Sequence, residues 1–238
     1  MIRHALSFAA ILSLVFLLGA DAPRDASSSD VEKGWQVLFD GTSTDGWRGL
    51  GMDGGFPHDR WEVRGGCLHC KGGAGKTVDL ITVRKYENFE ITFEWMCPKP
   101  PGNSGVKYRV QEKKGDGFAF GPEYQIMYDP DATDKHATGS LYDCIAPRGK
   151  TLRGPAEFND SRIIVRGGRV EHWLNGVKVV EFEFGSDELK AAVAKSKFRN
   201  TAWAKEPLGY IALQDHHEEV MFRCIRLREL NATGATDK

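Results

Sequence analysis

The sequence has almost no net charge and no internal repeat, and each absence argues against a class of protein. Its 32 Lys and Arg residues balance 33 Asp and Glu residues to a net charge of −1. Without a long-range field of one sign, the chain has little attraction for nucleic acid or an anionic membrane, which favours a neutral partner. No stretch of about 20 to 50 residues recurs, which disfavours propellers and solenoids.

The apolar run at the N-terminus is too short to cross a bilayer. It extends over the 14 residues 5–18, whereas a membrane-spanning helix needs about 20. Arg3 precedes the run and small residues follow it, which is typical of a signal peptide cleaved after Ala20 or Ala22. We therefore predict a signal peptide over residues 1–22 and a periplasmic or secreted protein with no membrane contact after cleavage. A retained anchor is disfavoured by the polar segment that follows, and a lipoprotein by the lack of cysteine in the first sixty residues.

Cysteine is scarce, and its spacing gives only a weak metal signal. An exported chain with these five residues could form at most two disulfides: Cys67, Cys70, Cys97, Cys144 and Cys224. Cys67 and Cys70 have a C-x-x-C spacing, but no second pair follows and Cys67 lies in an expected strand. We expect no cofactor. A divalent metal is a disfavoured alternative, with four candidate ligands: His216, His217, Glu123 and Asp129.

Composition divides the rest of the chain into a flexible linker at 23–33, one domain at 34–231 and a tail at 232–238. The domain consists of short segments rich in Val, Ile, Phe, Tyr and Trp, separated by Gly, Asn, Asp and Pro, a pattern typical of antiparallel strands. The segments expected to be strands are 35–39, 61–64, 67–69, 80–82, 89–97, 106–111, 123–128, 162–166, 169–174, 177–182, 210–214 and 220–229.

One helix and two tight turns complete the prediction. Residues 186–195 have a helical pattern, with Ser186 or Asp187 as the N-cap. The pairs Gly167-Gly168 and Asn175-Gly176 suit two-residue hairpin loops and predict a meander of three strands. The fold class is therefore all-β: a two-sheet antiparallel β-sandwich with one short helix.

Alternation along three expected strands places polar side chains on one face. The residues that would share this face are Lys107 and Arg109, Glu123 and Gln125, and Gln214 and His216. Asp215 points the other way or lies in the turn. Such residues, with Tyr and Trp beside them, favour a sugar-binding cleft on the concave face. The alternative is a solvated face with cross-strand ion pairs, such as a pair of Glu123 with Arg109.

A series of short motifs resembles one family over about residues 35–230. In order, the motifs are Leu38-Phe39-Asp40-Gly41, Gly46-Trp47, Trp61-Glu62-Val63, Asn103-Ser104-Gly105, Glu123-Tyr124-Gln125-Ile126, Thr138-Gly139-Ser140-Leu141-Tyr142, Asn175-Gly176, Leu213-Gln214-Asp215-His216 and Phe222-Arg223. They are similar to those of the 3-keto-disaccharide hydrolase domain family. The chain departs from the family pattern at Phe158, His217 and Cys224.

The resemblance implies a concanavalin-like, laminin-G-like jelly roll and, for some members, cleavage of glycosides oxidised to a ketone at C3. The ketone acidifies the C2 hydrogen, so a base can remove it, the C1 substituent can leave by elimination, and water can add afterwards. The substrate would be a saccharide, and an upstream sugar 3-dehydrogenase could supply it.

Each predicted site residue has a role in such a reaction. The predicted catalytic residues are Glu123 and His216 as base or acid, Arg109 as a stabiliser of the enolate, and Asp215 as a residue that orients His216. The residues expected to bind substrate are Asn103, Lys107, Gln125, Tyr142 and Gln214, of which Lys107 could also stabilise the enolate.

A lectin-like module remains open as an alternative function, whereas a conventional glycosidase is disfavoured. A conventional glycosidase needs two carboxyl groups flanking the bond, but Gln125 occupies the position where related glucanases carry a second acid. A non-catalytic lectin-like module could hold sugar with the same amides and aromatics. Substitution of Glu123 or His216 separates an enzyme from a lectin. In an enzyme it abolishes turnover while binding is retained, and in a lectin it only weakens binding.

Overall fold

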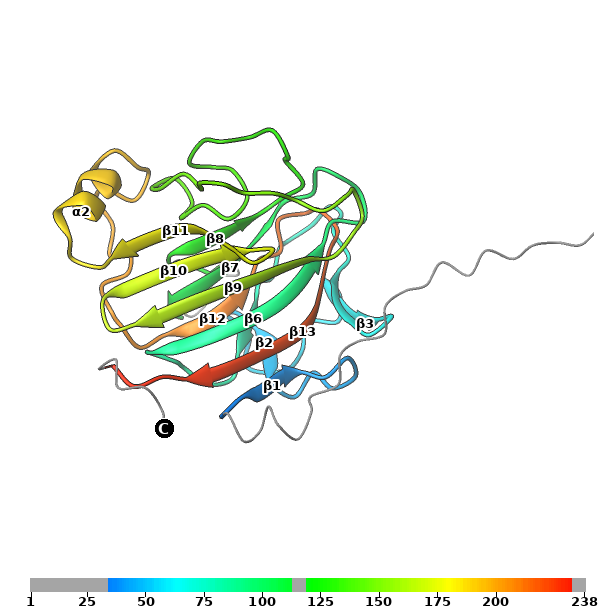
Figure 1. The fold of residues 1–238 in the computed structure, drawn as a ribbon. Helices are drawn as coiled ribbons and strands as arrows, with labels where there is room; N and C mark the ends of the chain where they lie inside the picture. Colours follow the sequence, from blue (N-terminus) through cyan, green and yellow to red (C-terminus); the bar gives the residue numbers. More distant parts are fainter. Residues whose placement is uncertain (1–33, 113–118, 233–238) are drawn as a thin grey trace, which may run out of the picture.

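The computed structural model describes residues 34–112 and 119–232 (Figure 1). The predicted signal peptide and linker, and most of the predicted tail, lie outside the described residues. No helix in the described ranges is long and apolar enough to cross a membrane.

Two antiparallel sheets pack against each other, which confirms the predicted β-sandwich (Figure 1). Across the larger sheet the strands are β11 (Val177–Glu183), β10 (Arg169–Leu174), β9 (Asn159–Arg166), β6 (Phe89–Met96), β13 (Val220–Glu229), β4 (Cys67–Cys70) and β3 (Trp61–Arg64), with β1 (Gln36–Phe39) paired to β13. Across the smaller sheet they are β2 (Trp47–Gly49), β5 (Leu80–Thr82), β12 (Tyr210–Leu213), β7 (Ser104–Val110) and β8 (Glu123–Ile126).

The predicted hairpins and helix are present. Strands β9, β10 and β11 form the expected meander, and Gly167, Asn175 and Gly176 adopt the positive φ angles of 58°, 47° and 83° that such turns require. The helix α2 (Asp187–Ala194) begins after Ser186, whose hydroxyl accepts a hydrogen bond from the Leu189 amide at 3.2 Å. All twelve expected strands form, with some ends shifted, and β2 is the one strand of the described residues that the prediction missed.

The core lies between the sheets and is rich in aromatic side chains. The largest fully buried ones include Trp61, Phe89, Trp95, Tyr108, Tyr124 and Phe222. Burying each apolar side chain of this kind contributes roughly 1.5–3 kcal/mol. The alternation that sends Val106 and Tyr108 into the core sends Lys107 to the outer face of the smaller sheet.

One histidine joins the two sheets inside this core. The Nε2 atom of His172 on β10 lies 3.0 Å from the Tyr108 hydroxyl on β7, and its Nδ1 atom lies 3.0 Å from the Gly139 carbonyl oxygen. His172 is fully buried. This histidine therefore belongs to the core and not to a cleft.

Candidate functional site

A cavity of about 360 Å³ opens on the outer face of the smaller sheet. Strands β7 and β8 and residue Gln214, just after β12, form its floor, and the chain around residues 119–121, 197–198 and 215–217 forms its walls. Five of the predicted site residues line it: Lys107, Glu123, Gln214, Asp215 and His216.

Strand pairing brings these residues together from distant parts of the sequence. Lys107 on β7 lies directly opposite Glu123 on β8. The amide of Gln214, just after β12, donates to the Gly105 carbonyl oxygen at 2.9 Å. The polar positions of three strands therefore share one face, as their alternation predicted.

Glu123 has the properties of a proton-transfer group. Its side chain is nearly buried, yet its carboxylate makes no hydrogen bond with another described residue, and its nearest ionic neighbour is the Lys107 ammonium at 3.9 Å. Burial raises the pKa of the Glu123 carboxyl above its ordinary value, and the positive charges of Lys107 and Lys197 oppose the shift. A cavity carboxyl whose pKa is raised above its ordinary value is a candidate general base or acid.

Asp79 was not among the predicted residues, although it contacts three residues that line the cavity. Its carboxylate is fully buried and lies 3.6 Å from the Lys107 ammonium. It accepts hydrogen bonds from the amides of Ala119 at 2.7 Å and Asp215 at 2.9 Å. The sequence signal was an acidic residue between the apolar residues Val78 and Leu80.

Asp215 does not orient His216, which corrects the role predicted for it. Its carboxylate accepts two hydrogen bonds from the buried Arg60 guanidinium, at 2.7 and 2.9 Å. Burial would raise the pKa of Asp215, but the bonds to Arg60 and nearby amides hold it below its ordinary value. The exposed His216 ring instead has its Nδ1 atom 3.1 Å from the Glu218 carboxylate.

Arg109 is turned away from the cavity, contrary to the expectation that it shares a face with Lys107. Strand β7 contains a register shift opposite β12, and Arg109 there has a φ angle of 53°. Its guanidinium donates to the Gly167 carbonyl oxygen at 3.0 Å and lies 3.7 Å from the centre of the Phe184 ring. Arg109 is therefore not placed to stabilise an enolate near Glu123.

The other three predicted residues do not line the cavity. The Gln125 side chain donates to the Asn103 side-chain oxygen at 3.0 Å, so these two amides bind each other. The amide of Tyr142 donates to the Glu123 carbonyl oxygen at 3.0 Å. The Tyr142 ring lies under the ammonium of Lys197, a cavity residue that the sequence analysis also missed.

One amide oxygen of a cavity-lining residue is unpaired. The side-chain oxygen Oε1 of Gln214 is buried and has no hydrogen-bond partner among the described residues. Unpaired buried polar atoms are rare because leaving one unpaired costs about 1–3 kcal/mol. In a cavity wall, such an oxygen can accept a hydrogen bond from a sugar hydroxyl.

The structure gives no support to the weak metal signals in the sequence. No group of three His, Cys, Asp or Glu side chains within the described ranges is arranged to hold a metal ion. All five cysteines are free thiols, and burial raises the pKa of Cys70 to about 12. The absence of a metal requirement remains a prediction.

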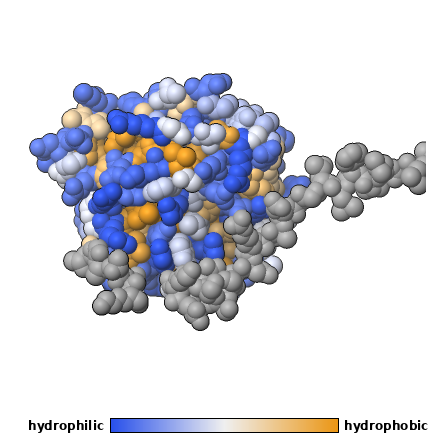
Figure 2. All heavy atoms as spheres, in the orientation of Figure 1, coloured by the Kyte–Doolittle hydropathy of each residue, from blue (hydrophilic) through white to orange (hydrophobic). Residues whose placement is uncertain are grey.

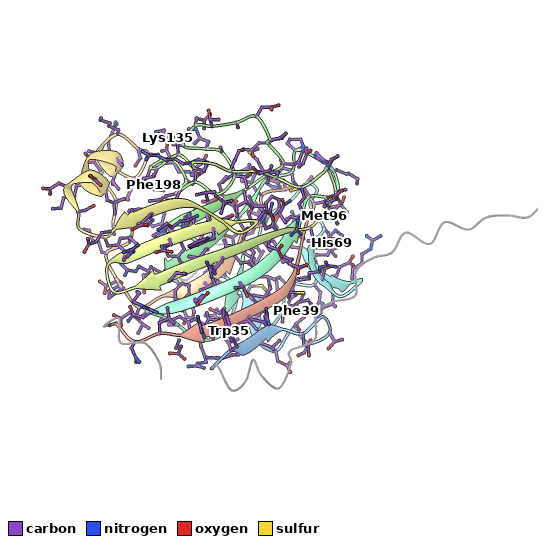
Figure 3. The ribbon with its side chains drawn as sticks, viewed as in Figure 1. Trp35, Phe39, His69, Met96, Lys135 and Phe198 are labelled. Carbon is purple, nitrogen blue, oxygen red and sulfur yellow. The ribbon has the colours of Figure 1, made fainter. Side chains whose placement is uncertain are left out.

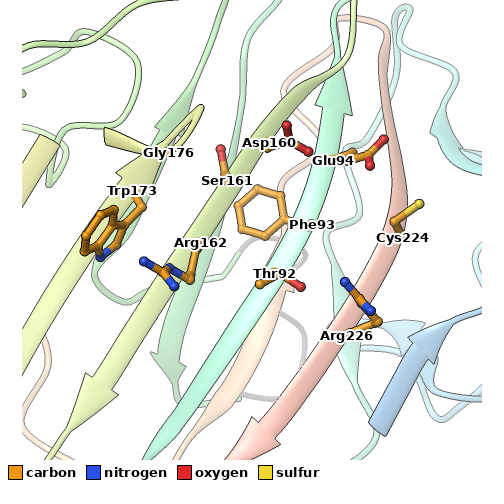
Figure 4. A pocket seen from close by; sticks show the side chains of 10 residues that line it. All are labelled: Thr92, Phe93, Glu94, Asp160, Ser161, Arg162, Trp173, Gly176, Cys224 and Arg226. Carbon is orange, nitrogen blue, oxygen red and sulfur yellow. The ribbon is translucent and has the colours of Figure 1, made fainter. Parts of the chain in front are cut away.

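A second cavity, of about 310 Å³, lies on the outer face of the larger sheet (Figure 4). Its acidic groups are engaged by arginines, with Glu94 bonded to Arg223 at 2.6 Å and Asp160 paired with Arg153. Arg162 lies 4.2 Å from the centre of the Trp173 ring. The surrounding surface mixes hydrophilic residues with small apolar patches (Figure 2). None of the predicted site residues lines this cavity.

The sequence matches the profile of a family described as the 3-keto-alpha-glucoside-1,2-lyase-like domain, over residues 34–228. It is 31% identical to a 3-keto-disaccharide hydrolase of Bacteroides thetaiotaomicron, in an alignment that covers 95% of this chain and 87% of the relative.

Solved structures show the same architecture. A crystal structure of a candidate glycosyl hydrolase from Parabacteroides distasonis has a TM-score of 0.77 and 31% identity, and the match covers 87% of this chain and 98% of the other. A second candidate glycosyl hydrolase from that organism has a TM-score of 0.62 and 25% identity, with 83% and 84% covered.

Proposed function

Because the chain belongs to the 3-keto-alpha-glucoside-1,2-lyase-like domain family, we propose that it cleaves glycosides carrying a ketone at C3, by elimination followed by hydration. The family resemblance drawn from the sequence motifs is confirmed. The relative named as a 3-keto-disaccharide hydrolase supports a saccharide substrate and hydrolysis as the net reaction.

Glu123 carries this proposal as the base. Of the carboxylic acids that line the cavity, Asp215 is engaged by Arg60, whereas Glu123 makes no hydrogen bond with a described residue. A conventional glycosidase needs two working carboxyl groups, so a single available one among the described residues favours elimination. Elimination needs one base because the C3 ketone already acidifies the C2 hydrogen.

The bond changes follow from the position of the ketone. Glu123 takes the C2 proton, and the C2–H electron pair forms a C2–C3 double bond while the carbonyl pair moves onto the C3 oxygen. The enolate then forms the C1–C2 double bond, restores the ketone and expels the C1 oxygen substituent. Water adds back across C1 and C2, with its oxygen at C1. The products are a 3-keto sugar and the released alcohol.

His216 is suited to protonate the leaving group. It lies at the exposed mouth of the cavity, and its Nδ1 atom lies 3.1 Å from the Glu218 carboxylate, which orients the ring. The unpaired Gln214 oxygen would accept a hydrogen bond from a sugar hydroxyl. These roles divide base, acid and binding among side chains that the fold brings to one cavity.

The substrate has to come from an oxidation. A ketone at C3 arises when a dehydrogenase removes hydrogen from the C3 hydroxyl of a glycoside, so a sugar 3-dehydrogenase would act upstream. The apolar N-terminal run supports export, which would place the enzyme in the periplasm or outside the cell.

A substrate panel tests the proposal. Purified protein is incubated with 3-keto-glycosides and with their unoxidised parents, with and without a chelator, and release of the C1 substituent is followed. We expect turnover of the keto compounds only, and a loss of about 10²–10⁴-fold in Glu123→Gln. The control is Glu188→Gln, which replaces an exposed residue of the helix.

Binding without turnover in the wild-type protein would support a lectin-like module and overturn the proposal. Chelator sensitivity would overturn the prediction that no metal is required.

A further inference from the structure

The proposed elimination needs a positive charge near the C3 oxygen, where negative charge develops as the enolate forms. The two cations that the sequence suggested for this role are badly placed. Arg109 is bonded to the Gly167 carbonyl oxygen outside the cavity. Lys107 is almost fully buried, and its ammonium lies between Asp79 and Glu123 and donates to the Ala119 carbonyl oxygen at 3.1 Å.

Lys197 is a second lysine at this cavity, and its ammonium has no carboxylate partner among the described residues. It lies just beyond α2, in the cavity wall that also contains Phe198. Figure 3 labels Phe198 close to this helix. Its ammonium forms no ion pair with a described residue. Lys197 and Glu123 line the same cavity, and the positive charge of Lys197 opposes the rise in the pKa of that carboxyl.

The surroundings of Lys197 hold its ammonium in position. Its backbone amide donates to the Asp143 carboxylate at 2.7 Å, which fixes the chain at this residue. The ammonium nitrogen lies 4.4 Å from the centre of the Tyr142 ring and 5.2 Å from that of the Phe198 ring. Aromatic faces attract a cation without neutralising it, so the charge remains available to a bound anion.

We propose that Lys197 is a catalytic residue whose ammonium binds the C3 oxygen of the substrate and stabilises the enolate. This assignment rests on the proposed function. Lys197 donates a hydrogen bond to the C3 oxygen as Glu123 removes the C2 proton, and it keeps its own proton throughout. Tyr142 and Phe198 restrict the ammonium to this part of the cavity.

The test uses three lysine variants that separate the effects of the charge, the shape and the position of the Lys197 side chain. Lys197→Met removes the charge but keeps much of the side chain, and Lys197→Arg restores a cation. Lys190→Met is the matched control, because Lys190 is an exposed helix lysine that pairs with Asp187 at 3.0 Å outside the cavity. Melting temperatures confirm that each variant is folded.

We expect kcat on a 3-keto-glycoside to fall about 10²–10³-fold in Lys197→Met, as for loss of one oxyanion donor, to recover partly in Lys197→Arg, and to stay unchanged in Lys190→Met. Exchange of the C2 hydrogen with D₂O should slow in parallel, because enolate formation is the affected step. A Lys197→Met variant within threefold of wild-type kcat would overturn this role alone. A wild-type protein that does not cleave the keto substrate would overturn the proposed function as well.

Discussion

Gly105 leaves the space that the Glu123 carboxylate occupies. A Cβ atom at Gly105 would lie only 2.5 Å from the Oε1 atom of Glu123. The backbone of Gly105 has no positive φ that would by itself require glycine. The small residue at this position is therefore explained by the placement of the candidate base.

Gly105→Ala should displace the Glu123 carboxylate and reduce turnover. A shift of about 1 Å in a catalytic group can lower the rate about 10²-fold, and we expect a loss of that size with little change in melting temperature. The matched control is Gly154→Ala, whose Cβ would lie 2.8 Å from the Glu157 carboxylate, which is exposed and able to move. Equal activity in the two variants would contradict the explanation.

Substitutions of Asp79 and Lys107 should shift the pH dependence of the reaction in opposite directions. Burial is the main cause of the raised pKa of Glu123, Lys107 lowers this pKa, and Asp79 raises it. A base must be ionised to act, so the rate rises with pH through the pKa of Glu123. Asp79→Asn should move this acidic limb to lower pH, and Lys107→Met should move it to higher pH.

The pH–rate profiles of kcat/KM for the two variants and the wild-type protein check this prediction. Activity is expressed per mole of folded protein, because both variants disturb a buried ion pair. If Asp79→Asn does not fold, the Lys107→Met variant alone tests the prediction, because its acidic limb should still move to higher pH. A shift of both variants in the same direction would mean that Glu123 does not set the acidic limb.

The strand pattern predicted much of this site because alternation is a local property. Lys107 and Glu123 lie at polar positions of apolar strands, Gln214 directly follows another, and strand pairing places these positions on one face. The same rule failed at Arg109, where the register shift of β7 changes the direction of the side chain. A register shift depends on both paired strands, and one sequence does not reveal it.

The residues that sequence analysis missed reach the site through tertiary structure. Arg60 precedes β3 and Lys197 follows α2, so neither belongs to a strand of the smaller sheet. Arg60 reaches Asp215 across 155 positions of the sequence. No local pattern indicates such a contact, because it forms only when the loops fold over the sheet.

The buried pair of Arg60 and Asp215 should be essential for stability. Removing one partner leaves an uncompensated buried charge, which costs about 3–5 kcal/mol. We expect Arg60→Met to lower the free energy of unfolding by that amount and to reduce activity, because Asp215 precedes His216 in the cavity wall. Urea unfolding measures the first effect and kcat the second.

A less buried pair provides the control for this prediction. Arg48 and Glu112 form a similar two-bond contact at 2.7 Å, but both side chains keep partial exposure. Exposed pairs contribute about 0–1 kcal/mol, so Arg48→Met should destabilise the protein much less. Equal losses in the two variants would show that burial of the Arg60 pair is not the decisive factor.

His172 should make the fold sensitive to mild acid. Burial lowers the pKa of His172 to about 4, whereas an unfolded histidine has a pKa of about 6.5. Between these values the unfolded chain binds a proton that the folded protein does not, so the free energy of unfolding falls as the pH falls from 6.5 towards 4. The loss for this residue is on the order of 3 kcal/mol.

Urea unfolding at pH 7, 5.5 and 4.5 compares the wild-type protein with His172→Gln and with His58→Gln, in which an exposed histidine is replaced. Glutamine can still bond to the Tyr108 hydroxyl and the Gly139 carbonyl oxygen but does not titrate. We expect His172→Gln to be less stable at pH 7 and to lose less stability on acidification, while His58→Gln follows the wild-type protein. If His172→Gln is as acid-sensitive as the wild-type protein, the acid sensitivity arises from other groups, because proton uptake by His172 would then contribute nothing to unfolding.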